Sequence, residues 1–130
     1  MAQQYIEMIL ARQLASYLST PVFLVGPEGT LLFYNEPAEA VLGRRFAETG
    51  PLGVEEWSSA WQPTDGAGDP LLPEELPLVV ALRERRPANG DIWIRGQDGV
   101  RRHIEVQAIP LLGIAGGFVG AVALFWETDP

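Results

Sequence analysis

The sequence predicts an α+β fold, and three observations lead to this prediction. A strand-like hairpin over residues 22–34 runs directly into a short capped helix over residues 35–43. A segment rich in Gly and Pro follows, and a helical stretch over residues 73–86 ends it. Three strand-like runs joined by short turns complete the chain. Two strands, then helices, then three antiparallel strands need no crossover between parallel strands, which is typical of an α+β arrangement.

The size and charge of the chain limit its class. Its 130 residues suit one domain, and 47% apolar residues are enough for a compact core. Seventeen acidic against nine basic residues give a net charge of −8, so neither nucleic acid nor an anionic membrane is an expected partner. We expect a cytoplasmic protein, because no run approaches the ~20 apolar residues of a membrane span and no charged leader precedes the first apolar stretch.

The first expected element is an amphipathic helix over residues 3–18. Only Glu7 and Arg12 interrupt it with charge, and Pro21 ends it by forcing Thr20 into an extended conformation. Six apolar residues recur on it at helical spacing: Ile6, Ile9, Leu10, Leu14, Tyr17 and Leu18. Because such a stripe must be buried on something, we assign residues 1–20 to a capping or dimerisation helix and residues 21–130 to the main domain.

The hairpin and the helix after it form the most specific local pattern. Asn35 is suited to accept a hydrogen bond from the first helical turn, and Pro37 falls where no amide proton is needed. Gly43 supplies the left-handed residue that ends the helix. Further along, Trp57 and Trp61 are four residues apart and therefore share one face of a short helix.

The second half of the chain is expected to contain one helix and three strands. Pro73 opens the helix, with acids at its start and arginines at its end, and Pro87 stops it. The expected strands are residues 91–95, 101–111 and 118–126, with Asp98 and Gly99 in the first turn and a Gly-rich second turn.

Several of these segments together resemble PAS domains of bacterial signalling proteins, especially those that precede histidine kinases. The resemblance rests on the Asn35 helix start, on residues 73–83, on Asp98-Gly99, and on residues 101–111 and 116–122, and it covers about residues 21–127. It implies a five-stranded antiparallel sheet in the order 2-1-5-4-3, with helices on one face and the N-terminal helix on the other. In many relatives the helices enclose a cavity that holds haem, flavin or a small metabolite, and in others side chains fill it.

Strand alternation then assigns each side chain to one face of this sheet. The residues expected around the cavity are apolar or small: Phe23, Val25, Phe33, Leu42, Phe46, Trp57, Trp61, Leu78, Leu82, Ile92, Ile94, Ile104, Val106, Ala108, Phe118, Gly120, Val122 and Leu124. The N-terminal helix and the outer sheet face are expected to form a dimer interface: Ile6, Ile9, Leu10, Leu14, Tyr17, Leu18, Val22, Leu24, Trp93, Ala121, Ala123 and Phe125.

Cofactor chemistry has little support in the sequence. His103 is the only histidine, and alternation points it away from the cavity, which argues against haem. A covalent flavin adduct is excluded because the chain has no cysteine. Asp65 and Asp69 lack the further oxygen ligands of a calcium loop and are expected in a plain turn. The cofactor therefore stays undetermined, and no metal site is expected.

These observations predict a sensory or signalling PAS domain that acts as a homodimer. We expect it to bind a small apolar or aromatic ligand, or a protein partner, and to act on an effector in trans, since no signalling helix follows residue 127. The alternative is an interaction or dimerisation scaffold with a filled core. An enzyme is disfavoured, because no nucleophile, acid–base pair or metal set converges in the sequence.

Overall fold

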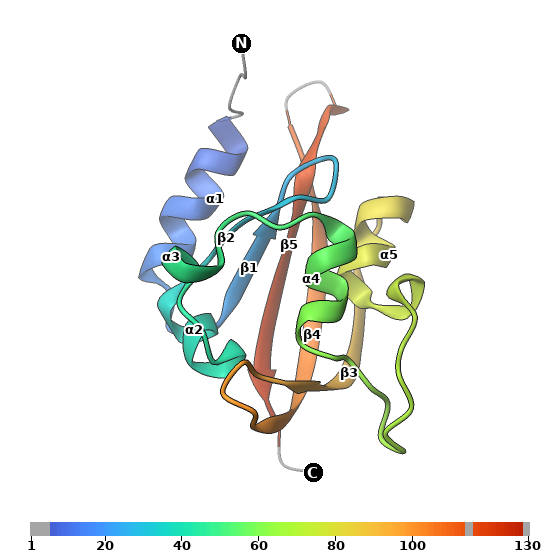
Figure 1. The fold of residues 1–130 in the computed structure, drawn as a ribbon. Helices are drawn as coiled ribbons and strands as arrows, with labels where there is room; N and C mark the ends of the chain where they lie inside the picture. Colours follow the sequence, from blue (N-terminus) through green and yellow to red (C-terminus); the bar gives the residue numbers. More distant parts are fainter. Residues whose placement is uncertain (1–5, 114–115, 129–130) are drawn as a thin grey trace.

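A five-stranded antiparallel sheet forms the centre of the molecule (Figure 1). The structure, a computed structural model, describes residues 6–113 and 116–128. The strand order is β2-β1-β5-β4-β3, as the resemblance predicts. The strands are β1 (Val22–Val25), β2 (Leu31–Tyr34), β3 (Ala88–Arg95), β4 (Arg101–Leu112) and β5 (Phe118–Glu127).

The helices cover the two sheet faces unequally, as Figure 1 shows. One face, called the inner face here, carries four α-helices and a 3-10 turn: α2 (Glu36–Leu42), α3 (Phe46–Thr49), α4 (Val54–Ala60), η1 (Pro73–Glu75) and α5 (Pro77–Glu84). The opposite, outer face carries α1 (Ile6–Tyr17), so residues 3–5 of the expected helix lie outside the described residues. The helix expected to begin at Pro73 is split at Leu76, which is extended because Pro77 follows it.

Asn35 connects three elements near the start of α2. Its side-chain oxygen accepts hydrogen bonds from the amides of Ala38 (3.1 Å) and Val22 (2.9 Å). Its side-chain nitrogen donates to the carbonyl oxygens of Ala15 and Thr20, both at 2.9 Å. The predicted helix cap is thus confirmed, and the same side chain also holds the end of α1 and the start of β1.

Two separate apolar clusters lie on the two sides of the sheet. The larger one fills the space between the inner face and α2, α4 and α5, and Phe23, Val25, Ile104 and Val106 belong to it as expected. The smaller one joins Ala15 of α1 to residues of β1 on the outer face, including Val22 and Leu24. The inward and outward assignment of β1 side chains is therefore correct.

The assignment of β5 side chains is wrong by one residue. Ala121, Ala123 and Phe125 lie in the inner cluster, whereas Val122 and Leu124 face α1. Cross-strand partners share a face, and Phe23 pairs with Ala123 while Leu24 pairs with Val122. The prediction extends the alternation of β4 across the turn into β5. A bulge at Leu111/Leu112 shifts the register there, so the β5 residues predicted to face inward face outward, and the reverse.

Two other expected inward side chains also face outward. Phe33 pairs with Leu24 and packs on the outer cluster, so Tyr34, the partner of Phe23, occupies the inward position. Gly120 is directed toward α1, since a β-carbon there would lie 2.9 Å from Cε of Met8. Both corrections follow from the pairing with β1, and this pairing cannot be predicted from the alternation of residues within one strand.

The helix α1 covers the outer face with a different side from the one expected. Met8, Ala11, Ala15 and Leu18 contact the sheet. Most of the predicted stripe points to solvent, with exposed fractions from 46% to 84%: Ile6, Ile9, Leu10, Leu14 and Tyr17. The small side chains of Ala11 and Ala15 in this cluster let the helix approach the strands closely, which the larger residues of the stripe would prevent. Nearer the start of the helix, Met8 lies over Gly120, which has no side chain.

Candidate functional site

An apolar cavity of about 90 Å³ lies between the inner face and α4 and α5. The sheet contributes aromatic and branched side chains from β1, β3, β4 and β5, the helical segments line the other side, and the cavity stays partly open to solvent. The residues around it are Phe23, Leu42, Trp57, Ser58, Trp61, Pro63, Leu76, Pro77, Leu78, Ile92, Ile94, Ile104, Val106, Ala123 and Phe125. None of these side chains carries a charge, so any binding here depends on apolar contact.

Both tryptophans of the cavity wall have their polar atoms satisfied by the backbone. The indole N–H of Trp57 donates to the carbonyl oxygen of Gly29 at 2.7 Å, and that of Trp61 donates to Leu42 at 3.0 Å. The two residues share one face of α4 and its end, as their spacing predicts. With these bonds made, the indoles are fixed in place and no ring N–H is left for a ligand.

Phe23 is the centre of an aromatic cluster that stiffens the wall. Its ring lies edge-on to Trp57 (5.6 Å between centroids) and to Trp61 (6.0 Å), and it stacks on Tyr34 (5.9 Å). The Tyr34 hydroxyl donates to the carbonyl of Arg44 at 2.9 Å and also lies 2.8 Å from Oγ1 of Thr49. Burial raises the pKa of Tyr34, so this hydroxyl stays protonated and serves as an anchor to the loop.

The structure brings about half of the expected cavity residues together. Those that line the cavity are Phe23, Leu42, Trp57, Trp61, Leu78, Ile92, Ile94, Ile104 and Val106. Others belong to the surrounding core without reaching the cavity: Val25, Phe46, Leu82 and Ala108. Phe118 lies under Arg85, whose guanidinium carbon is 4.7 Å from the ring centroid, and it is not part of the lining. The outward-facing residues do not line it either: Phe33, Gly120, Val122 and Leu124.

Sequence reasoning misses several lining residues for two different reasons. Ala123 and Phe125 are expected on the outer face, and the correct phase of β5 would have found them. Pro63 and Leu76 come from loop and turn segments, and Pro77 is the first residue of α5, so no periodic pattern indicates which of these side chains points inward.

The lining does not fit haem or flavin. His103 lies on the outer face, where Nε2 is 2.9 Å from Asp91 and Nδ1 is 2.8 Å from Thr128, so its imidazole cannot reach the cavity. Within residues 6–113 and 116–128 no three metal-ligating side chains come together. A cavity of about 90 Å³ is also well below the ~300 Å³ at which pockets for drug-sized ligands begin.

The Asp65 loop and the lengths of the helices bear on two further expectations. Asp65 closes a turn by accepting hydrogen bonds from the amides of Ala67 (2.9 Å) and Asp69 (3.0 Å), as expected for a plain turn. Of the helices that the structure describes, none is long and apolar enough to cross a bilayer.

The arrangement of the chain matches that of PAS domains of known structure. No family model and no curated protein matches the sequence. Among solved structures, the PAS domain of a protein from Colwellia psychrerythraea is 17% identical with a TM-score of 0.67, and the match covers 93% of this chain and 96% of that one. The PAS domain of BvgS from Bordetella pertussis is 17% identical with a TM-score of 0.64, over 95% and 87% of the two chains.

The d2 variant of the protein RsLOV is 16% identical with a TM-score of 0.72, and the match covers 99% of this chain and 69% of that one. These sequence identities are too low to infer a function from the matches. The shared topology over nearly the whole chain nevertheless establishes the fold. The chain has the PAS fold.

Proposed function

We propose that this protein is a sensory or signalling domain whose input is a small, uncharged apolar molecule bound in the cavity. The observation that carries the proposal is the apolar cavity of about 90 Å³ between the inner face and the helices α4 and α5. PAS domains of a sensor histidine kinase and of BvgS share the fold, which supports a signalling role. Apolar cavities without polar partners are suited to small hydrocarbons.

The chemistry of the wall restricts the ligand further. The hydroxyl of Ser58 is directed to the carbonyl of Glu55, and both indole N–H groups are already bonded. A polar ligand would therefore lose its hydrogen bonds to water without replacement, at a cost of about 1–3 kcal/mol per group. A compact aromatic or aliphatic molecule without hydrogen-bonding groups fits these conditions.

Strand β5 supplies a route from the cavity to α1. Ala123 and Phe125 line the cavity, and Val122 and Leu124 alternate with them and pack under α1. A ligand that displaces the cavity-lining residues of β5 by a fraction of an ångström thereby also displaces the residues on which α1 rests. The signal would be a shift of α1 between two positions, and the size of this shift would depend on the difference in ligand affinity between the two states.

We also propose that residues 1–20 act as a dimerisation segment on the domain formed by residues 21–130. The exposed stripe of α1, consisting of Ile6, Ile9, Leu10, Leu14 and Tyr17, is unusual for a surface helix. The helix carries one acid and one base, whereas the whole chain has a net charge of −8. A second copy can therefore approach this surface without the repulsion that it meets elsewhere.

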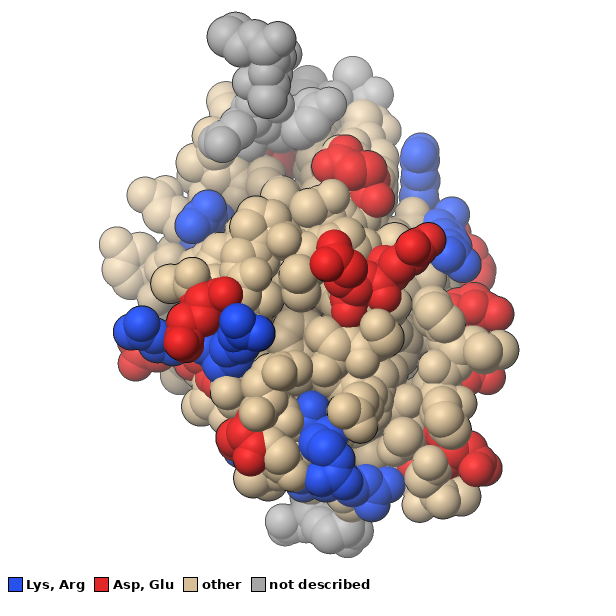
Figure 2. All heavy atoms as spheres, viewed as in Figure 1, with Lys and Arg blue, Asp and Glu red and all other residues tan. Residues whose placement is uncertain are grey.

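The helix-covered side of the molecule is a poorer binding surface for a partner that carries charge of a single sign. Figure 2 shows acidic and basic side chains interspersed over this face, with no continuous basic surface. This distribution favours self-association through α1 over electrostatic docking on the helical side.

Binding of toluene tests the proposal, with benzoate as a charged analogue. We expect toluene to give saturable chemical-shift changes at Trp57, Trp61 and Phe125, and benzoate to give none. Ala123→Leu adds carbon atoms inside the cavity and should weaken toluene binding about tenfold or more. Ala47→Leu makes the same change at an exposed position and should leave binding unchanged. Absence of saturable binding by toluene would instead favour the scaffold with a filled core.

A further inference from the structure

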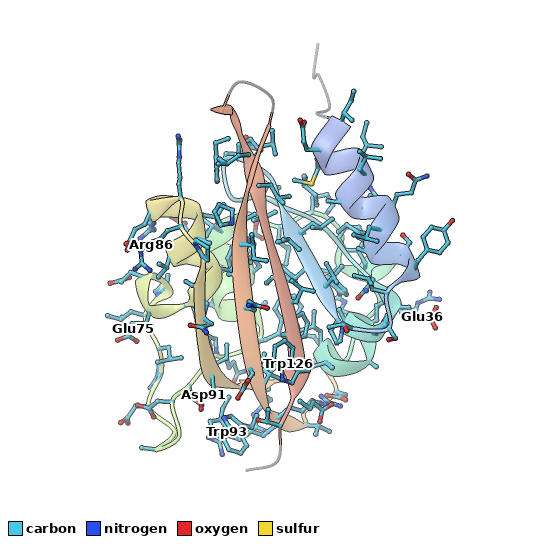
Figure 3. All side chains as sticks on the ribbon, turned by 180° about the vertical axis from the view of Figure 1, so that it is seen from behind. Glu36, Glu75, Arg86, Asp91, Trp93 and Trp126 are labelled. Carbon is cyan, nitrogen blue, oxygen red and sulfur yellow. The ribbon has the colours of Figure 1, made fainter. Side chains whose placement is uncertain are left out.

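On the outer sheet face, no helix of the described part of the chain covers β3 and β4. Figure 3 shows α1 beside β1, while β3, β4 and the adjoining length of β5 are open to the viewer. Asp91, Glu105 and Trp126 are cross-strand neighbours on β3, β4 and β5 and form one row across this open surface, which we call the acidic row. All three are exposed, and the exposed fraction of Trp126 is 39%.

A groove of about 410 Å³ runs along the acidic row. Its other side is formed by Asn89 and Gln107, which are themselves cross-strand partners one step further along β3 and β4. The groove thus combines two carboxylates, two carboxamides and an exposed indole, and differs in chemistry from the apolar cavity on the inner face.

The negative charge of the acidic row is incompletely compensated. Asp91 and Glu105 lie directly opposite each other, an arrangement in which like charges destabilise a sheet. His103 bonds to Asp91, but within residues 6–113 and 116–128 the carboxylate of Glu105 has no hydrogen-bond or ion-pair partner. The nearest arginines of β4 are engaged elsewhere, Arg101 over the ring of Trp93 and Arg102 with Asp98.

The edge of β3 next to the groove is also available. At Trp93, the backbone N–H and C=O bond to Thr64 at 2.9 and 2.8 Å, so these groups point away from β4. With the two-residue period of a strand, the backbone groups of Asn89 and Asp91 point to that same side. β3 is an edge strand, and these two residues are exposed. An extended segment laid along this edge would find both donors and acceptors.

We propose that the acidic row and the adjoining edge of β3 dock an extended, arginine-bearing segment of a partner protein. A guanidinium group can form paired hydrogen bonds with the carboxylate of Glu105 while its plane stacks on the indole of Trp126. The carboxamides of Asn89 and Gln107 then meet polar groups further along the segment. A free small cation gains little on so open a surface, because single exposed ion pairs contribute about 1 kcal/mol or less.

The test uses a six-residue peptide of three Thr-Arg repeats, acetylated and amidated, which places its arginines on one side of an extended chain. Two-dimensional NMR should show saturable shifts at the amides of Asn89 and Asp91 and at the indole N–H of Trp126. The same peptide with citrulline in place of arginine keeps the shape, loses the charge, and should bind at least fivefold more weakly.

Glu105→Gln removes one charge from the groove and should weaken peptide binding about fivefold. Glu74→Gln removes another exposed acid, from the helical side, and should not change peptide binding. The proposal is overturned if the citrulline peptide binds equally well, if Glu105→Gln has no effect, or if no saturable shift appears. It is also overturned if N-acetyl-arginine amide binds as tightly as the peptide, because the surface would then recognise a small cation.

Discussion

The side-chain nitrogen of Asn35 donates a hydrogen bond of 2.9 Å to the carbonyl oxygen of Ala15, and this contact joins the start of α2 to the end of α1. The residue is 2% exposed and makes four hydrogen bonds to backbone groups. The helix on the outer face is therefore attached to the hairpin by a buried polar side chain as well as by apolar packing.

Replacing Asn35 by Ala should lower the free energy of unfolding by about 3 kcal/mol. Loss of the cap accounts for about 1 kcal/mol, and the buried amide of Val22 and the carbonyl of Ala15 left without this partner account for the rest. Urea denaturation followed by circular dichroism measures the change. Asn89→Ala, at an exposed asparagine, is the control and should stay within about 0.5 kcal/mol of wild type. A comparable value for the two variants would contradict this role of Asn35.

The exposed stripe of α1 can be tested without disturbing the fold. Leu10 and Leu14 are 57% and 61% exposed, so the double change Leu10→Glu and Leu14→Glu should leave thermal stability of the monomer nearly unchanged. It should convert a dimer to a monomer in sedimentation equilibrium at micromolar concentration, because two carboxylates per copy would be buried in the interface. Leu72→Glu, at a residue 57% exposed far from α1, should remain dimeric. A monomeric wild-type protein would refute the dimer.

Gly120 is expected to be the least replaceable glycine near α1. Its φ of +138° is unfavourable for other residues, and a β-carbon would collide with the carbonyl oxygen of Val25 and approach Cε of Met8. Gly120→Ala should therefore cost about 3 kcal/mol or more. Gly99→Ala, where φ is +82° and no atom lies within 4 Å, isolates the backbone effect and should cost about 1 kcal/mol. Equal losses in chemical denaturation would show that the close approach of Val25 and Met8 to Gly120 is unimportant.

The ion pair between Asp98 and Arg102 predicts a pH dependence of stability in the acid range. Hydrogen bonds from Arg102 lower the pKa of Asp98 to about 2, from an ordinary value of 3.8. Because the folded-state pKa lies below the unfolded one, this contribution is complete above about pH 4 and is lost as the pH falls toward 2. The urea midpoint of wild type should fall over this range more steeply than that of Asp98→Asn. Identical slopes would show that the pair does not contribute.

Much of the fold is predictable because its signals are local. The cap at Asn35 and the stop at Gly43 depend on residues within one helical turn, and both appear as expected. The strands follow from their alternation and turn residues, and together with the hairpin they are enough to indicate the PAS topology. The inward assignment of Phe23 on β1 and Ile104 on β4 is correct for the same reason, since alternation within a strand is a short-range property.

What the sequence by itself determined was therefore the set of elements, their order and the apolar character of the inner wall. Only the tertiary structure decided which face of β5 lines the cavity and which side of α1 rests on the sheet. The first depends on pairing with β1, almost a hundred residues away in the chain, across a bulge that shifts the register. The second depends on Ala11, Ala15 and Gly120 being small enough for close approach. Both are consequences of packing between distant segments, and no periodicity within one segment contains them.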